Sequence, residues 1–156
     1  YALTTSNWMT IMTYNLARVT DQPELWQDSD PIHPNLAPDF KTAEGREVMG
    51  LKGEDGAWKA FMCYARTTEV PRSIEELVQM TSSRGEVVVP YTVWSFEKGA
   101  GREIVNQILD MARAQKGVKR VVTLSPQSEM ALRFHTRNGA QVFRVNAETV
   151  NYEYTV

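Results

Sequence analysis

The sequence predicts an α/β fold with a mixed β-sheet, and three observations lead to this prediction. Residues 87–96 are rich in β-branched and aromatic side chains, which is typical of a largely buried strand. Two glycines follow, and from Arg102 the apolar residues recur at helical spacing as far as Gly117, which is placed as a helix C-cap. Residues 118–124 then form a second apolar run. A strand, a helix and a strand in this order predict a right-handed crossover and a parallel strand pair.

The segment before this unit is predicted to begin with a helix and to continue as an irregular acidic stretch. Residues 3–6 resemble a strand end followed by a helix N-cap, and apolar spacing predicts a first helix that ends near Val19. Four prolines in residues 21–45 exclude a long helix, although Pro23 is placed to open one short turn. Because this stretch holds six acidic residues and one lysine, it is predicted either as a solvated surface loop or as a flexible wall of a substrate site that favours a cationic acceptor.

Antiparallel elements are predicted on both sides of the central unit. Residues 47–52 and 58–65 flank an Asp-Gly turn, which is a strong hairpin signal, and Ser73 precedes a short amphipathic helix. Ser125 is predicted as the N-cap of the last helix, with Pro126 at its first position and Gly139 just after its end. Residues 141–154 form a closing hairpin. The predicted sheet is therefore mixed.

Composition limits the classes of function. At 156 residues the chain fits one domain, 1–156, and its net charge of −2 gives no basic field for nucleic acid or an anionic membrane. No apolar run approaches the ~20 residues of a membrane span, and no signal peptide is visible. The single cysteine, Cys63, lies in an apolar run and excludes an internal disulfide. The two histidines, His33 and His135, lack the spacing of a metal site. We expect a cytoplasmic protein without a bound metal.

The junction between the central strand and its helix is a candidate phosphate-binding loop. A helix N-terminus directs free N–H groups and about half a positive charge at one point, and Gly99 and Gly101 allow a tight turn there. Lys98 and Arg102 add fixed positive charge on either side. A Gly-x-Gly pair alone is a weak signal, because a strand-to-helix turn that merely needs small residues has the same pattern.

Two motifs give the chain a resemblance to the GNAT acyltransferase superfamily. The family's acyl-CoA signature is (Arg or Gln)-x-x-Gly-x-(Gly or Ala), and residues 96–101 match its two small positions, with Phe96 in place of Arg or Gln. A second family pattern is Asn-x-x-Ala-x-x-x-Tyr-x-x-x-Gly-Phe, and residues 128–140 match its Ala and its Gly. Ser128 and His135 replace the Asn and the Tyr. The order of the predicted elements also fits the family along nearly the whole chain.

The resemblance implies a fold in which strands four and five splay apart around an acyl-CoA thioester. It also implies an N-acyltransferase that moves an acetyl group from acetyl-CoA to a primary amine of a small molecule or peptide by direct attack. The backbone of the fourth strand would pair with the pantetheine arm, and the loop that follows would bind the pyrophosphate. The residues placed at the cofactor by this resemblance are Trp94, Ser95, Phe96, Lys98, Gly99, Ala100, Gly101, Arg102 and Ser128.

Three residues are candidates for catalysis. His135 takes the place of the family's tyrosine, which protonates the leaving thiolate, and an imidazolium is a competent acid near neutrality. A histidine on an amphipathic helix is also often a packed or surface residue. Tyr91 and Glu86 are candidates for the general base, but strand alternation alone does not say which side chains point inward. Glu97 is expected to be solvated beside the phosphates.

The departures at Phe96, Ser128 and His135 also fit a second class of function. A GNAT-like domain without catalysis would serve binding or assembly, and the last helix is similar to that of a GNAT-like internal virion protein of T7-like phages. The partner would then be a virion component instead of an amine. The closing hairpin is a common pairing edge in the family, so a homodimer is also possible under either hypothesis.

Overall fold

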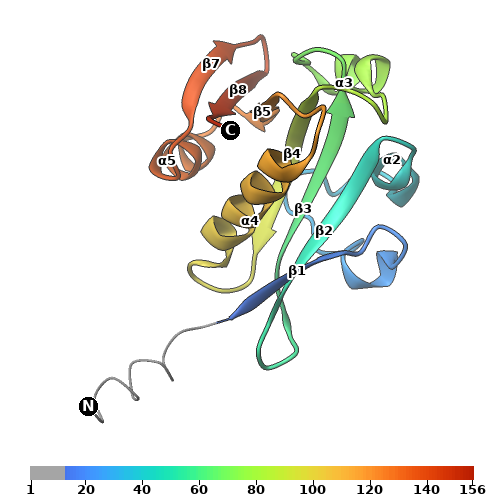
Figure 1. Ribbon diagram of the computed structural model, residues 1–156, viewed down its shortest axis with the longest axis vertical. Helices are drawn as coiled ribbons and strands as arrows, with labels where there is room; N and C mark the ends of the chain where they lie inside the picture. Colours follow the sequence, from blue (N-terminus) through green and yellow to red (C-terminus); the bar gives the residue numbers. More distant parts are fainter. Residues whose placement is uncertain (1–12) are drawn as a thin grey trace.

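The computed structural model describes residues 13–156, which form one mixed β-sheet with helices on both faces (Figure 1). The strand order is β1-β2-β3-β4-β5-β8-β6, and β7 pairs with β8 outside this path. The strands are β1 (Tyr14–Arg18), β2 (Arg46–Gly53), β3 (Trp58–Thr67), β4 (Val87–Ser95), β5 (Arg120–Val122), β6 (Ser125–Pro126), β7 (Gln141–Val145) and β8 (Thr149–Tyr154). The helices are η1 (Pro23–Leu25), α2 (Pro38–Thr42), α3 (Ile74–Met80), α4 (Ala100–Ala114) and α5 (Glu129–Arg137).

Two apolar clusters hold this arrangement together, one on each face of the sheet. The larger one packs the buried side of α4, including Ile104 and Ile108, against Met62 and Val88 of the sheet. The second packs Trp26 and the opposite side chains of β3 and β4 beneath η1, α2 and α3. Because successive side chains of a strand point to opposite faces, β4 contributes to both clusters. Its position in the middle of the sheet explains its apolar sequence.

The central unit and the hairpins have the structure that the sequence predicts. β4 leads through Gly99, which has φ of +88°, into α4, and β4 pairs parallel with β5. The β2–β3 and β7–β8 pairs are antiparallel. The Ser73 hydroxyl accepts a hydrogen bond from the Glu76 N–H and so caps α3. The mixed sheet is thereby confirmed.

The first predicted helix is wrong where the structure describes it. Residues 14–18 form β1, which pairs antiparallel with β2 from Tyr14 opposite Gly53 to Arg18 opposite Met49. Tyr14 and Leu16 pack against the α4 side of the sheet and Ala17 against the other side, which is the alternation of a strand. The free edge of β2 decides the conformation of this segment. The rest of the predicted helix, with the strand end and N-cap at residues 3–6, lies outside the described residues.

The predicted start of the last helix is also wrong. Ser125 and Pro126 form β6, and Ser125 pairs with Val150 of β8. The helix begins at Glu129 instead, with the Ser128 hydroxyl accepting from the Ala131 N–H. A strand partner distant in the sequence therefore overrides the local Ser-Pro signal.

The acidic stretch is more ordered than a solvated loop. Pro23 opens the short turn η1 as predicted, and a second short helix, α2, follows. Trp26 is buried, and the Asp30 carboxylate forms an ion pair of 2.8 Å with Lys41. The side chains of this pair are 0% and 1% exposed. Its one lysine thus neutralises its one buried carboxylate.

β4 and β5 separate soon after they meet, as the resemblance implied. They pair at Val87–Arg120 and Val88–Val121, and the Leu124 N–H donates to the Pro90 carbonyl at 2.9 Å. Beyond Pro90 no strand pairs with this edge of β4 in residues 13–156. Figure 1 shows β5, β8 and β7 diverging from β4 at one end of the sheet. None of the helices in the described part of the chain has the length and apolar character needed to cross a lipid bilayer.

Candidate functional site

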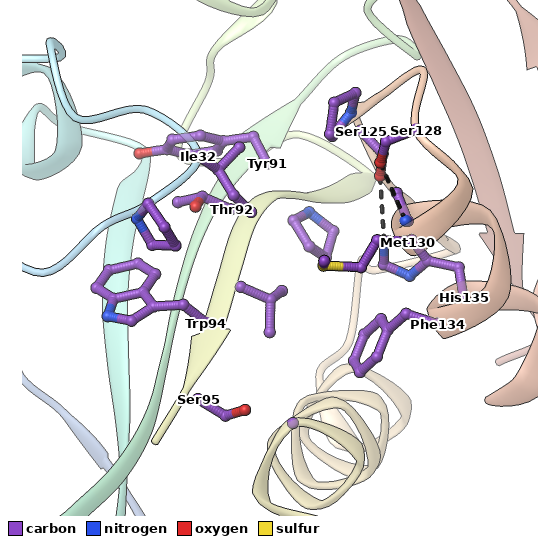
Figure 2. Close-up of a pocket in the computed structure, with 16 residues that line it drawn as sticks. Ile32, Tyr91, Thr92, Trp94, Ser95, Ser125, Ser128, Met130, Phe134 and His135 are labelled. Carbon is purple, nitrogen blue, oxygen red and sulfur yellow. Dashed lines mark hydrogen bonds between the residues drawn. The ribbon is translucent and has the colours of Figure 1, made fainter. Parts of the chain in front are cut away.

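A cavity of about 370 Å³ occupies the gap that opens between β4 and the β6–α5 segment. Figure 2 shows Ile32, Tyr91, Thr92 and Trp94 along one side of it. Ser125, Ser128, Met130, Phe134 and His135 lie along the other side. Because the lining comes from both faces of the sheet, the cavity passes beside the edge of β4. Most of the lining side chains are apolar, and no carboxylate is among those in the described residues.

The edge of β4 that faces this cavity carries unpaired backbone groups. The Phe96 N–H donates to the Lys59 carbonyl of β3 at 2.9 Å. Since backbone groups alternate between the two edges of a strand, Ser95 and Val93 direct theirs to the opposite edge. No strand covers that edge in residues 13–156. An extended ligand with amide groups could pair with it as an added strand does.

The N-terminus of α4 lies at one end of this edge and is suited to an anion. The Ala100 N–H donates to the backbone carbonyl of Glu97, and the Glu103 N–H donates to that of Gly99, each at 3.1 Å. Within residues 13–156 the Gly101 and Arg102 N–H groups have no partner. Gly99 has φ of +88°, and a Cβ there would meet no atom within 4 Å, so the space above it is open. These are the groups that bind phosphate at a helix N-terminus.

The charged residues around this loop leave it positive. Lys98 and Arg102 are exposed, and neither forms an ion pair with the described residues. The Glu97 carboxylate is partly exposed, accepts a hydrogen bond from the Tyr14 hydroxyl at 2.8 Å and lies 3.2 Å from the Lys59 ammonium. These two contacts lower the pKa of Glu97. Its charge is therefore compensated away from the helix N-terminus.

Gly101 is explained by packing instead of by backbone conformation. A Cβ at this position would lie 3.1 Å from the Phe134 ring, which is tighter than ordinary contact. Gly101 is buried, so α4 approaches α5 closely here. Gly99 and Gly101 thus serve different purposes: the first supplies a positive φ and open space, and the second allows two helices to meet.

His135 lies at the other end of the cavity in a hydrogen-bonded chain of side chains. Its Nε2 is 3.2 Å from the Ser125 hydroxyl and its Nδ1 is 2.8 Å from the Tyr154 hydroxyl (Figure 2 shows the Ser125 contact). Ser125 in turn donates to the Thr123 hydroxyl at 2.8 Å. The imidazole also stacks on the Tyr152 ring, with centroids 5.0 Å apart. With Ser125 donating to Thr123, Nε2 carries the proton and Nδ1 accepts from Tyr154.

The environment of His135 keeps the imidazole neutral. The side chain is buried, and burial lowers its pKa to about 4. Among residues 13–156 no carboxylate hydrogen-bonds to it to counter this effect. Burial also raises the pKa of Tyr154, so that its hydroxyl keeps its proton. The imidazolium acid expected from the sequence is therefore not the resting form near neutral pH, and His135 acts there as a neutral donor or acceptor.

The structure does not bring the two proposed bases together with His135. The Tyr91 ring lines the cavity, but its hydroxyl is buried without a hydrogen-bond partner in the described residues and points away from His135 (Figure 2). Burial raises the pKa of Tyr91. Glu86 lies just before the other end of β4, outside the cavity lining, and its exposed carboxylate is 3.4 Å from the Lys119 ammonium.

The proposed cofactor residues are divided between the cavity and its surroundings. Trp94, Ser95 and Ser128 line the cavity, and Ser128 also caps α5. Phe96 does not line it: the residue is 57% exposed, and its ring packs edge-on against Phe61 of β3. Ala100 is buried at the start of α4.

Ser125 is a cavity residue whose place the sequence does not reveal, because the local Ser-Pro pattern predicts a helix cap there. Only the pairing of β6 with β8 places its hydroxyl beside His135. No local pattern in the sequence indicates that pairing.

Comparison with solved structures identifies the fold. Malonyl-CoA decarboxylase from Agrobacterium vitis matches with a TM-score of 0.75 and 15% identity over 99% of this chain and 63% of that protein. The GphF GNAT-like decarboxylase in complex with isobutyryl-CoA matches with a TM-score of 0.71 and 16% identity over 92% of this chain and 98% of that one. Arabidopsis thaliana NAA60, in complex with a bisubstrate analogue, matches with a TM-score of 0.59 and 13% identity over 90% and 96%. No family model and no curated protein matches the sequence.

The chain has the GNAT fold. The splayed β4–β5 pair, the free edge of β4 and the glycine turn into α4 are the features of that fold that the sequence motifs indicated. The three structures named above give no support to the resemblance to a phage virion protein.

If the open N-terminus of α4 binds the phosphates of a CoA compound, replacing Gly99 with valine should weaken that binding about 100-fold or more, because a Cβ fills the open space there and φ of +88° disfavours a branched residue. Gly56 offers a matched control: it has φ of +82°, is equally open, and lies in the distant β2–β3 turn. Gly56→Val should cost similar stability and leave CoA affinity unchanged in calorimetric titration. Equal affinities for the two variants would remove Gly99 from the ligand site.

Proposed function

We propose that this chain binds an acyl-CoA thioester along the free edge of β4, with its acyl group beside Ser125 and His135. The phosphates would lie at the N-terminus of α4, where two N–H groups have no partner within residues 13–156. The amides of the pantetheine arm would pair with Ser95 and Val93. The cavity connects these groups to the Ser125–His135 pair, because Ser95, Gly101 and both members of the pair line it.

The reaction that the cavity supports best is decarboxylation of a short carboxyacyl-CoA, such as a malonyl thioester. The observation that carries this proposal is the neutral Ser125–His135 pair in a cavity lined largely by apolar side chains and by no carboxylate of the described residues. An apolar wall disfavours the localised charge of a substrate carboxylate more than the spread charge of the transition state. The Ser125 hydroxyl, on turning from Thr123 toward the substrate, can donate to the developing enolate oxygen while the imidazole N–H donates to the Ser125 oxygen.

The step balances with one proton taken from solvent. The bond between the carboxylate carbon and the α-carbon breaks, and CO₂ leaves. The bonding pair moves onto the α-carbon and the thioester carbonyl as an enolate, whose oxygen the Ser125 hydroxyl would bind after turning from Thr123. The α-carbon then takes a proton, for which the chain from Tyr154 through His135 to Ser125 offers a path. No oxidant or reductant takes part, and CoA remains attached to the shortened acyl group.

Acetyl transfer from acetyl-CoA to an amine is the second candidate. Its supporting observation is that the cavity reaches both faces of the sheet, so an amine could approach the thioester from the Ile32 side. The structural neighbour NAA60 is known in complex with a bisubstrate analogue. However, an amine needs a base, and an imidazole whose pKa is about 4 is a weak one. The acidic stretch also attracts a cationic acceptor less than expected, because Lys41 neutralises Asp30.

Incubation of the protein with malonyl-CoA should yield acetyl-CoA and CO₂. Mass spectrometry measures the acetyl-CoA, and trapping measures the CO₂. Replacing Ser125 with alanine removes a donor to the enolate oxygen and is expected to lower this rate about 100-fold. Ser83→Ala, at an exposed serine before β4, is the matched control and should leave the rate unchanged.

The alternatives have their own outcomes in the same experiment. Acetylation of a panel of amines by acetyl-CoA, with no loss of CO₂ from malonyl-CoA, would replace decarboxylation with acyl transfer. Failure of CoA to bind at millimolar concentration would contradict both reactions and favour a binding or assembly protein.

A further inference from the structure

The buried ion pair between Asp30 and Lys41 lies next to Pro31 and Ile32, which line the cavity. The Asp30 carboxylate has four hydrogen-bond donors around it. The Lys41 ammonium donates to Oδ2 at 2.8 Å, and the Thr92 hydroxyl donates to Oδ1 at 2.9 Å. The backbone N–H groups of Ile32 and His33 also donate to Oδ1, at 2.8 and 3.1 Å. This pattern, in which an aspartate accepts from the residues two and three positions later, fixes a turn.

The partner of Asp30 is held just as firmly. The Lys41 side chain is 1% exposed, and its ammonium lies 5.7 Å from the centre of the Trp26 ring and 5.8 Å from that of Trp94. The Trp94 indole N–H donates to the Ser29 hydroxyl at 2.9 Å, one residue before Asp30. The ion pair thus ties three parts of the chain together: the turn at residues 29–33, α2 and β4.

Stability alone does not explain this ion pair. Removing two charges from water is costly, and apolar side chains of similar size often serve a fold as well or better. The pair instead fixes the position of the residues that follow Asp30. Asp30 is followed by Pro31 and Ile32, which line the cavity, and its bond to Thr92 joins them to β4 at the point where the sheet opens. Figure 2 shows Ile32 next to Tyr91 and Thr92 and across the cavity from His135.

We infer that Asp30 is a positioning residue that fixes the wall formed by Pro31 and Ile32, and that this wall limits the length of the acyl group the cavity accepts. The inference rests on the proposed function, since it assumes that the acyl group lies between Ile32 and His135. The substrates it names are thioesters of short acyl groups. A wall released from β4 would move outward and admit longer chains.

Two substitutions of Thr92 separate the hydrogen bond from the volume of the side chain. Thr92→Val keeps the branched shape and removes the hydroxyl that donates to Asp30. Thr92→Ser keeps the hydroxyl and removes a methyl group, which enlarges the cavity slightly. The affinities of CoA, propionyl-CoA and hexanoyl-CoA are measured by calorimetric titration for both variants and the parent protein. Thermal unfolding establishes that each variant is folded.

Thr92→Val is expected to shift the ratio of hexanoyl-CoA to propionyl-CoA affinity about tenfold in favour of the longer chain, with the affinity of CoA itself unchanged. Thr92→Ser should keep the parent ratio. The opposite pattern, a shift in the serine variant and none in the valine variant, would overturn the inference, because volume alone would then set the selectivity.

A second measurement makes the inference independent of CoA binding. If Thr92 fixes the wall, amide hydrogen exchange at Ile32 and His33 should become about tenfold faster in Thr92→Val and stay at the parent rate in Thr92→Ser. Exchange within α4 should not change in either variant. Unchanged exchange at Ile32 and His33 in the valine variant would show that Asp30 does not need Thr92 to hold the wall. If no CoA compound binds to the parent protein, the proposed function fails, and the exchange rates still decide whether the wall is fixed in this way.

Discussion

Replacing His135 with phenylalanine is expected to lower the rate of the proposed acyl-thioester reaction by about 10²–10⁴-fold. The phenyl ring can keep the stacking on Tyr152, but it cannot form the hydrogen bonds that His135 makes with the Ser125 and Tyr154 hydroxyls. Since the hydrogen bonds of His135 go to Ser125 and Tyr154 and not to the N-terminus of α4, the affinity for CoA should change little. Single-turnover rates and calorimetric titration measure the two quantities. Thr136→Ala, at the exposed neighbour on α5, serves as the control.

The pH dependence of the protein carries a second signature of His135. Its pKa in the folded protein is about 4, below the unfolded value of about 6.5, so the unfolded chain binds more protons between these values. The free energy of unfolding should therefore fall as the pH drops from about 7 to 5, by about 2 kcal/mol from this residue. Urea unfolding at both pH values should show a smaller drop in His135→Phe. Equal drops would show that the pKa of His135 is not lowered in the folded protein, and equal turnover would return His135 to a packing role.

Replacing Lys41 with methionine is expected to be the most damaging single change to stability. The ion pair it forms with Asp30 is almost fully buried, so the substitution leaves a carboxylate without its counter-charge in the core. Breaking a buried pair in this way costs about 3–5 kcal/mol. Urea unfolding measures the loss. Lys119→Met is the control, because Lys119 pairs with Glu86 at the exposed surface and should contribute little.

Lys41→Met should also reverse the pH dependence of the contribution that Asp30 makes to the free energy of unfolding. Burial raises the pKa of Asp30, but the hydrogen bonds from Lys41, His33, Ile32 and Thr92 outweigh this effect and the pKa is lowered. In the parent protein Asp30 therefore contributes stability that is lost as the pH falls. Without Lys41, burial prevails and raises the pKa of Asp30, so the folded state favours the protonated acid. The stability that Asp30 contributes to the variant is then present at low pH and lost as the pH rises. The double variant Asp30→Asn/Lys41→Met should regain part of the stability, and no recovery would mean that packing around Lys41 matters more than its charge.

The sequence predicts those parts of the fold that are determined locally. The β4–α4 unit follows from a change of apolar period at Gly99, and the β2–β3 hairpin follows from an Asp-Gly turn. The glycine at the helix N-terminus could be placed for the same reason, since its role depends on its immediate neighbours. Ser73 as a helix cap belongs to this group as well.

The remaining features depend on partners that are distant in the chain. β1 is a strand because the edge of β2 is free, and Ser125 faces His135 because two residues of β6 pair with β8. Asp30 is buried because Lys41 and Thr92 meet it there, which no acidic pattern reveals. The pKa of His135 likewise follows from its burial and not from its neighbours in the sequence. Local patterns thus predicted the glycine turn into α4 and missed the Ser125–His135 pair.

β8 has a consequence for how this protein is made. It pairs with β5, β6 and β7, and it supplies the Tyr152 ring and the Tyr154 hydroxyl that hold His135. A growing chain that has reached α4 already contains the glycine turn and the edge of β4, but it cannot yet complete the Ser125–His135 pair. That pair is therefore among the last parts of the structure to form during synthesis, because its partners lie in residues 149–154 at the end of the sequence.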